Sequence, residues 1–243
     1  MKKNKLGLII SLLIIIIFII LVSKNLLFFG NKNIKPVQNI DEVKLKEEKL
    51  EEINLEEINL EEDEEILDEK ISNSDVIGRI AIDGTSIDTV LVQSNDNDYY
   101  LSHNIDKQKD IYGSIFMDYR NTYQDRKLLI YGHNSKKKKA VFSDLEKFVN
   151  ESFYKDNKYI HLTLNNERTD WIIFSIMIIE NTSNKHMKIS FNDTQFEKHI
   201  KWLKDNSIYN TYVDVDISDR ILLLQTCYYN PNNSYLIISA KEI

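Results

Sequence analysis

The distribution of apolar and polar positions divides the chain into three parts. An uninterrupted apolar run comes first, from Leu6 to Val22, and holds 17 residues without a charge. A long acidic stretch follows it. From Val76 onward, short apolar runs alternate with turn residues. Each part predicts a different kind of structure.

The first run predicts a transmembrane helix. As a helix, Leu6–Val22 would rise roughly 26 Å, slightly less than the ~30 Å hydrocarbon core of a bilayer, and Leu26–Phe29 would extend it. The alternative is a cleaved signal peptide, but the run is long and no small-residue cleavage site follows it. Lysines crowd the amino end, which favours a cytoplasmic amino terminus and an extracytoplasmic domain. We expect a cytoplasmic tail at 1–5 and a membrane anchor at 6–29.

The acidic stretch predicts a solvated helical stalk. From Asp41 to Lys70 it holds 15 acidic and 4 basic residues, a local charge of −11, so the rest of the chain carries +4 of the total −7. It lacks Gly and Pro, which favours helix. The pentapeptide LEEIN occurs twice in succession, and a five-residue step does not keep its leucines on one helix face. The repeat therefore favours a spacer over a coiled-coil zipper. We expect the stalk at 30–62 and a short docking helix at 63–75.

The remainder of the chain predicts a mostly β domain. Eight short runs rich in β-branched and apolar residues are separated by turn residues, a pattern typical of a closed barrel or a sandwich. The runs are Ile77–Ile82, Thr89–Gln93, Ser114–Met117, Lys127–Tyr131, Tyr159–Leu164, Trp171–Ile179, Arg220–Thr226 and Tyr235–Ala240.

Two helices are expected between these strands. Ser143 and Glu146 have the spacing of a capping box, and an apolar face follows them. Thr194 and Glu197 repeat this spacing and predict a helix over Thr194–Asp205.

Composition narrows the classes of function. With one cysteine, the chain forms no internal disulfide and has no Cys-Xaa-Xaa-Cys metal or redox pair. The net charge of −7 argues against a general nucleic-acid binder, and no glycine-rich phosphate loop is present. The tripeptide at 96–98 lacks the other ligands of a calcium loop. We expect neither a cofactor nor a metal.

Two residues at the ends of predicted strands form the candidate chemical pair. Cys227 follows the run Ile221–Thr226, and His133 follows Leu128–Tyr131. A cysteine nucleophile needs a group that supports the thiolate and later protonates a leaving amine, and histidine does both near neutral pH. Taken alone, the pattern also fits a cysteine that serves as a small buried hydrophobe. The remaining histidines, interpreted as surface or structural residues, are His103, His161, His186 and His199.

The motifs around this pair resemble those of the class B sortases of Gram-positive bacteria. The matching segments are Val76–Ile80, Asp96–Leu101, Gly113–Asn121, Tyr131–Asn134, Phe142–Leu145, Trp171–Ser175 and Leu224–Cys227. The resemblance implies an eight-stranded sortase-type β-barrel at 76–243, with amino-terminal and peripheral helices, behind a single membrane anchor.

It also implies an activity, that of a membrane-bound, cysteine protease-like transpeptidase of the hydrolase class, which anchors surface proteins to the cell wall. Cys227 would attack the carbonyl after Thr in a carboxyl-terminal sorting signal of a secreted protein, and His133 would protonate the departing amine. An amine of a peptidoglycan precursor or a pilin would then resolve the thioester. Membrane lipid is the third expected partner, nucleic acid is not expected, and the chain is expected to be a monomer with an extracellular catalytic domain. Residues expected to contact the substrate are Asn134, Thr226 and Tyr228.

The sequence departs from the family pattern at one position. Sortases carry an arginine at the start of the strand after the cysteine loop, where it steadies the substrate or the oxyanion. The corresponding residues here, Ser234 and Tyr235, are the candidate substitutes, and Tyr235 could donate one neutral hydrogen bond, weaker than a charge-assisted bidentate one. Arg220 lies seven residues before Cys227, roughly 23 Å along a strand at ~3.3 Å per residue, which is too far to replace it. A second hypothesis is therefore a sortase-fold binding module with weak or no catalysis.

A run of four lysines, Lys136–Lys139, follows His133 closely. It is interpreted as a solvated loop, with a landing site for anionic wall polymer or lipid head groups as the alternative.

Overall fold

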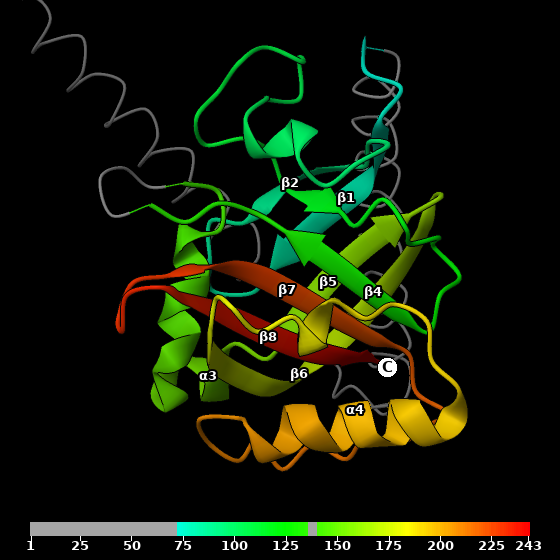
Figure 1. The fold of residues 1–243 in the computed structure, drawn as a ribbon, viewed down its shortest axis with the longest axis vertical. Coiled ribbons are helices and arrows are strands. Elements are labelled where there is room, and N and C mark those ends of the chain that lie inside the picture. The colour runs from blue at the N-terminus through cyan, green and yellow to red at the C-terminus, as the bar shows by residue number, and fades with distance from the viewer. Residues whose placement is uncertain (1–71, 136–139) are drawn as a thin grey trace, which may run out of the picture. The chain divides into compact units, whose positions relative to one another are not determined.

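The structure, a computed structural model, describes residues 72–135 and 140–243. Eight strands form a closed barrel in the order β1-β2-β3-β4-β7-β8-β6-β5 (Figure 1). The strands are β1 (Val76–Ile82), β2 (Asp88–Val92), β3 (Phe116–Met117), β4 (Lys127–Tyr131), β5 (Tyr159–Leu164), β6 (Glu167–Glu180), β7 (Ile221–Tyr228) and β8 (Ser234–Glu242). The eight predicted strands and the predicted barrel are confirmed.

Several sequence predictions fall outside the described residues. These are the anchor at 6–29, the stalk at 30–62, most of the docking helix at 63–75, and the lysine run at 136–139. Between residues 72 and 135 and from 140 to the end, no helix has the length and apolar character needed to cross a bilayer.

Short helices decorate the barrel. They are η1 (Tyr99–Leu101), η2 (Ser143–Val149), α3 (Glu151–Asp156), η3 (Lys185–Met187) and α4 (Asp193–Asp205). The longest of them, α4, lies on the outside of the barrel and packs against β6 (Figure 1).

Both predicted capping boxes were wrong, although helical structure forms at both places. The Ser143 hydroxyl accepts a hydrogen bond from the amide of Ala140, and η2 is a 3-10 helix without a side-chain cap. In α4 the capping box joins Asn192 and Gln195. Asn192 has the extended backbone of an N-cap residue, and Asn caps as well as Ser or Thr, so the helix begins at Asp193.

Strands β4 and β7 are buried on both faces. Leu128 and Leu222 pack inside the barrel, in a cluster to which every strand contributes. Their neighbours Leu129 and Leu223 face outward into a second cluster, which includes Phe196 and other residues of α4. Because β4 and β7 are parallel neighbours covered on both sides, their sequences are near-continuous apolar runs rather than alternating ones.

Candidate functional site

The predicted pair, His133 and Cys227, emerges at the same end of two adjacent strands. In the parallel pairing of β4 with β7, Tyr131 lies opposite Gln225. His133 and Cys227 each follow two residues later. The ladder continues past the strand end, because the amide of Gly132 donates to the carbonyl oxygen of Gln225 at 3.2 Å. The fold therefore brings together the two residues that the sequence singled out.

The Cys227 thiol lies in an uncharged environment. The residue is half-buried, and burial raises the pKa of its thiol. Within 72–135 and 140–243, no hydrogen bond or ion pair joins its sulfur to His133 or to any lysine or arginine side chain. In the resting structure the neutral thiol is therefore the favoured form at neutral pH.

The His133 ring is held by a backbone carbonyl. Its Nε2 lies 2.7 Å from the carbonyl oxygen of Leu101, at the end of η1. A carbonyl oxygen only accepts, so Nε2 carries the hydrogen in this contact. Nδ1 is then the ring nitrogen that remains to exchange a proton.

The three predicted substrate contacts are engaged within the protein. Asn134 is buried, and its Nδ2 donates to the carbonyl oxygen of Cys227 at 3.0 Å and to Oε1 of Glu146 at 2.5 Å. Thr226 is buried and donates through its hydroxyl to the carbonyl oxygen of Gly132 at 2.7 Å. Tyr228 packs into the interior cluster of the barrel. These three side chains therefore support the site through contacts inside the protein.

The two residues at the family's arginine position face opposite sides of β8. In the antiparallel pairing of β7 with β8, Tyr235 lies opposite Cys227 and Ser234 lies opposite Tyr228. Successive side chains on a strand alternate between its faces, so Tyr235 shares the face of Cys227. Ser234 is buried on the other face, toward the barrel interior.

The five arginines of the chain are engaged away from the thiol. Four pair with carboxylates at 2.7–2.8 Å: Arg79 with Asp88, Arg120 with Asp118, Arg126 with Asp193, and Arg220 with Glu242. Arg168, on β6, lies 3.9 Å from Asp170. None of them occupies the place of the family arginine.

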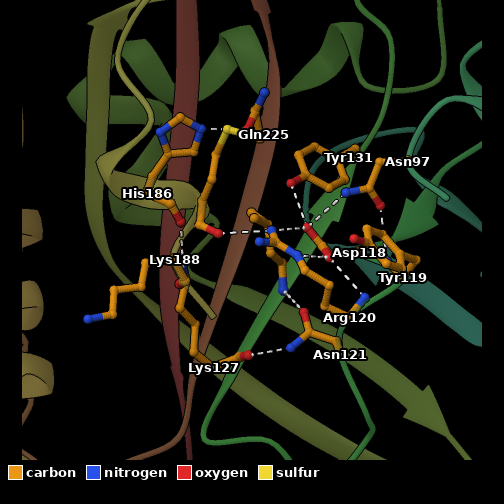
Figure 2. Close-up of polar contacts among 12 residues, drawn as sticks. Asn97, Asp118, Tyr119, Arg120, Asn121, Lys127, Tyr131, His186, Lys188 and Gln225 are labelled. Atoms are coloured by element: carbon orange, nitrogen blue, oxygen red, sulfur yellow. Dashed lines mark hydrogen bonds and ion pairs between the residues drawn. The ribbon is translucent and has the colours of Figure 1, made fainter. Parts of the chain in front are cut away.

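A polar network beside the site holds the turn η3 against the barrel (Figure 2). Asp118, fully buried, accepts hydrogen bonds from Arg120, from the Tyr131 hydroxyl and from Asn97. Arg120 also donates to the carbonyl oxygen of Met187 at 2.9 Å.

The buried Lys127 completes this arrangement. Its Nζ donates to the carbonyl oxygen of His186 and, at 2.7 Å, to that of Lys188. Three successive carbonyls, those of residues 186–188, thus accept from Arg120 and Lys127, and burial lowers the pKa of Lys127 to about 7. We call Arg120, Lys127 and these carbonyls the carbonyl clamp.

The clamp holds His186 close to the strand that carries Cys227. His186 is fully buried, and its Nε2 lies 2.6 Å from Oε1 of Gln225, two residues before the thiol. Its ring meets the Tyr235 ring edge-on, with centroids 5.9 Å apart and an interplanar angle of 65°. Burial lowers the pKa of His186 to about 4, so the ring is neutral at physiological pH.

Sequence reasoning did not identify His186, Lys127 or Gln225 as parts of the site. His186 stands among polar residues with no periodicity to indicate burial, and Lys127 merely opens an apolar run. Two segments of the resemblance carried a signal: Leu224–Cys227 contains Gln225, and Asp118–Asn121 supplies Arg120 to the clamp and a hydrogen bond from Asn121 to the Lys127 carbonyl.

The remaining histidines have structural contacts. His103 stacks on Tyr99, and His161 lies between Asp83 and Asp170. His199 is buried on α4 beside Phe191. In the part of the chain that the structure covers, no group of three or more His, Cys, Asp or Glu residues is arranged to hold a metal ion.

Comparisons with known proteins agree with this geometry. The family model of the sortase domain matches residues 80–243. Sortase B of Listeria monocytogenes is 37% identical over 161 residues, which span 64% of this chain and 63% of the relative.

Solved structures show the same fold. A mutant form of Clostridium perfringens sortase B superposes with a TM-score of 0.73 at 34% identity, covering 77% of this chain and 90% of that one. A Staphylococcus aureus sortase B–substrate complex gives a TM-score of 0.69 at 26% identity, over 82% of this chain and 98% of that one. The family model, the identities and the barrel with its His133–Cys227 strand ends together show that the chain belongs to the sortase family, among the class B sortases.

Proposed function

We propose that the chain is a membrane-anchored cysteine transpeptidase that joins secreted proteins to an amine of the cell wall. One observation carries the proposal: the only thiol of the chain and a histidine leave adjacent parallel strands at the same end, and one ring nitrogen of that histidine has no hydrogen-bond partner among the described residues. The family to which the chain belongs supports the same reaction class.

The first half-reaction forms a thioester. The Cys227 thiol gives its proton to Nδ1 of His133, and the resulting thiolate attacks the carbonyl carbon of a peptide bond in a carboxyl-terminal sorting signal. The carbon–nitrogen bond breaks, and His133 gives a proton to the departing amine. The amino-terminal part of the substrate stays on Cys227 as an acyl group.

The second half-reaction transfers this acyl group. An amine of a peptidoglycan precursor or a pilin attacks the thioester carbon and loses a proton to His133. The carbon–sulfur bond breaks, and the thiolate leaves as the new amide forms. Splitting one difficult amide exchange into two steps is the advantage of the covalent route.

The location follows from the chain's first part. The apolar run Leu6–Val22, its extension Leu26–Phe29 and the lysines before it support a single anchor with a cytoplasmic amino end and an extracellular barrel. Access of an added protease to the barrel in intact cells, but not to a tag at the amino terminus, is the expected result.

A second candidate function is favoured by the site's electrostatics. The thiol pKa is raised and no arginine lies beside Cys227 among the residues described, which would suit a sortase-fold module that binds sorting signals without acylation.

One experiment separates the two. The full-length chain is incubated with a panel of sorting-signal peptides, and acyl adducts are sought by intact-mass spectrometry, with Cys227→Ala as control. A transpeptidase gives an adduct with at least one peptide, lost in Cys227→Ala and released by an added amine. Binding of a peptide with no adduct under any condition would establish the binding module instead.

A further inference from the structure

The feature that separates this chain from the family pattern is Tyr235, which lies directly across from Cys227. The two residues are paired across the β7–β8 ladder and share its outer face. Residues directly opposite in an antiparallel pair have Cβ atoms roughly 4.5–5.5 Å apart. A tyrosine side chain is longer than this separation, so its hydroxyl can reach the space around a group bound to the sulfur.

The Tyr235 hydroxyl is uncommitted. The side chain is half-buried, and none of the hydrogen bonds within 72–135 and 140–243 involves its oxygen. Neighbouring tyrosines are engaged, because Tyr131 donates to Asp118 and Tyr229 donates to the carbonyl oxygen of Asn134. Burial, and then the charge of Cys227, raise the pKa of Tyr235, so its hydroxyl keeps its hydrogen throughout the neutral range.

The Tyr235 ring is held in place. His186 packs edge-on against it, and His186 is itself fixed by Gln225 through its ring and by Lys127 through its carbonyl. A donor fixed before the reaction needs no reorganisation when charge develops, and this is the condition under which a single hydrogen bond contributes most to a rate.

We propose that the Tyr235 hydroxyl is a catalytic hydrogen-bond donor to the scissile carbonyl oxygen, in the position where the family carries an arginine, with His186 as its positioning residue. The inference rests on the proposed function. As the Cys227 sulfur bonds to the carbonyl carbon, negative charge moves to the carbonyl oxygen, and Tyr235 donates to it without giving up its proton. The donor is neutral, so it stabilises the oxyanion less than a charged, two-pronged guanidinium would.

The test compares acylation rates in full-length variants with the reactive peptide, under single-turnover conditions. Tyr235→Phe keeps the ring on His186 and removes only the hydroxyl, and we expect its acylation rate to fall by about 10²-fold with little change in KM. Tyr159→Phe, on β5, is the matched control and is expected to acylate at the wild-type rate. The rate of Cys227 alkylation by iodoacetamide reports folding around the thiol and is expected to stay within twofold in both variants.

Tyr235→Arg provides the complementary measurement. Because it supplies a stronger donor from the same position, we expect its acylation rate to equal or exceed that of the wild type. Acylation by Tyr235→Phe within threefold of wild type would overturn the inference and leave the proposed function intact. Absence of acylation in the wild type with every peptide would overturn both.

Discussion

The side-chain amide of Asn134 donates a hydrogen bond to the backbone carbonyl oxygen of Cys227 at 3.0 Å. Asn134 belongs to the segment after β4 and Cys227 to β7, so this bond ties together the two strand ends that carry the candidate pair. The same amide also reaches Glu146 on η2. One buried side chain thus fixes the distance between the histidine loop, the cysteine strand and a helix.

Replacing this amide should loosen the site. In Asn134→Ala the Cys227 carbonyl loses its donor, and we expect the free energy of unfolding to fall by about 1–3 kcal/mol. Asn134→Asp, of nearly equal size, places a carboxylate against the carbonyl and Glu146, and should be destabilised further. Urea unfolding of both variants checks this order. Equal stability of Asn134→Asp and wild type would contradict the role of the amide as donor.

The reactivity of Cys227 should depend on pH as that of an isolated, buried thiol. Burial raises its pKa, so the thiolate fraction is small at neutral pH and grows only as the solution becomes alkaline. The pH profile of iodoacetamide alkylation of this single cysteine, followed by mass spectrometry, should therefore have its midpoint above that of a free cysteine, near ~8.5.

His133→Ala provides the control for this profile, since no bond joins the two side chains among the described residues. It should leave the alkylation midpoint in place while slowing acylation by about 10²–10⁴-fold. A wild-type midpoint below that of free cysteine, shifted upward in His133→Ala, would instead reveal a standing thiolate–imidazolium pair.

Gly132 is required by a close approach to the core. A Cβ at this position would lie 2.6 Å from Cδ2 of Phe142, whose side chain is fully buried. We expect Gly132→Ala to cost about 1–3 kcal/mol through overpacking and to displace the adjacent His133. The double variant with Phe142→Leu should recover part of the loss relative to the sum of the single changes. Strict additivity in thermal unfolding would show that the two side chains do not interfere.

The barrel could be predicted from the sequence, because strands buried on one or both faces show as apolar runs whatever their partners. All eight predicted runs fall on observed strands, including β4 and β7. The positions of Cys227 and His133 at strand ends were predictable for the same reason. Helix starts were less certain, because Asn192 and Thr194 are both good capping residues and only the backbone conformation distinguishes them.

The surroundings of the pair could not be predicted in this way. Lys127 meets the carbonyls of His186 and Lys188 across about sixty residues of chain, and neither partner carries a local signal of that meeting. His186 is fully buried, and its carbonyl and those of the next two residues accept hydrogen bonds from the barrel side. Long-range polar contacts of this kind depend on topology, whereas hydrophobic periodicity depends on the local segment.

Removing one side of the carbonyl clamp should release η3. Lys127→Met keeps the length and the apolar stem but removes the donor to two carbonyls, and we expect faster amide hydrogen exchange in residues 184–191 and a higher KM for the sorting peptide. Lys155→Met, which removes an exposed lysine paired with Glu151, is the matched control and should change neither measurement. Unaltered exchange in Lys127→Met would show that other contacts hold the turn.

Acid should destabilise the fold through its buried histidines. Burial lowers the pKa of His186 to about 4 and that of His199 to about 3, against ~6.5 in an unfolded chain. Below pH ~6.5 the unfolded state binds protons that the folded state does not, so stability falls as the pH is lowered toward 4, by up to about 1.4 kcal/mol per pH unit for each histidine.

Urea unfolding between about pH 7 and pH 5 measures how steeply the free energy of unfolding changes with pH. This interval lies above the range in which most carboxylates titrate. His199→Phe, which keeps an aromatic ring beside Phe191 on α4, should show a shallower slope than the wild type. An unchanged slope would place the acid sensitivity elsewhere in the protein.

The carbonyl clamp also divides the connection between β6 and β7. This connection, residues 181–220, is tethered to the barrel at 186–188, and only the longer part beyond the tether carries α4. Closing a loop between fixed points costs free energy that grows only with the logarithm of its length, roughly 0.6 kcal/mol per doubling. The segment between α4 and β7 is itself fixed to the barrel and to η2, since the amide of Ile208 donates to the carbonyl oxygen of Ile176 at 2.7 Å and the hydroxyls of Tyr209 and Thr211 donate to those of Phe148 and Phe174. An insertion or deletion that breaks these contacts therefore costs more free energy than loop closure alone, and length variation in this connection is tolerated only where it leaves them in place.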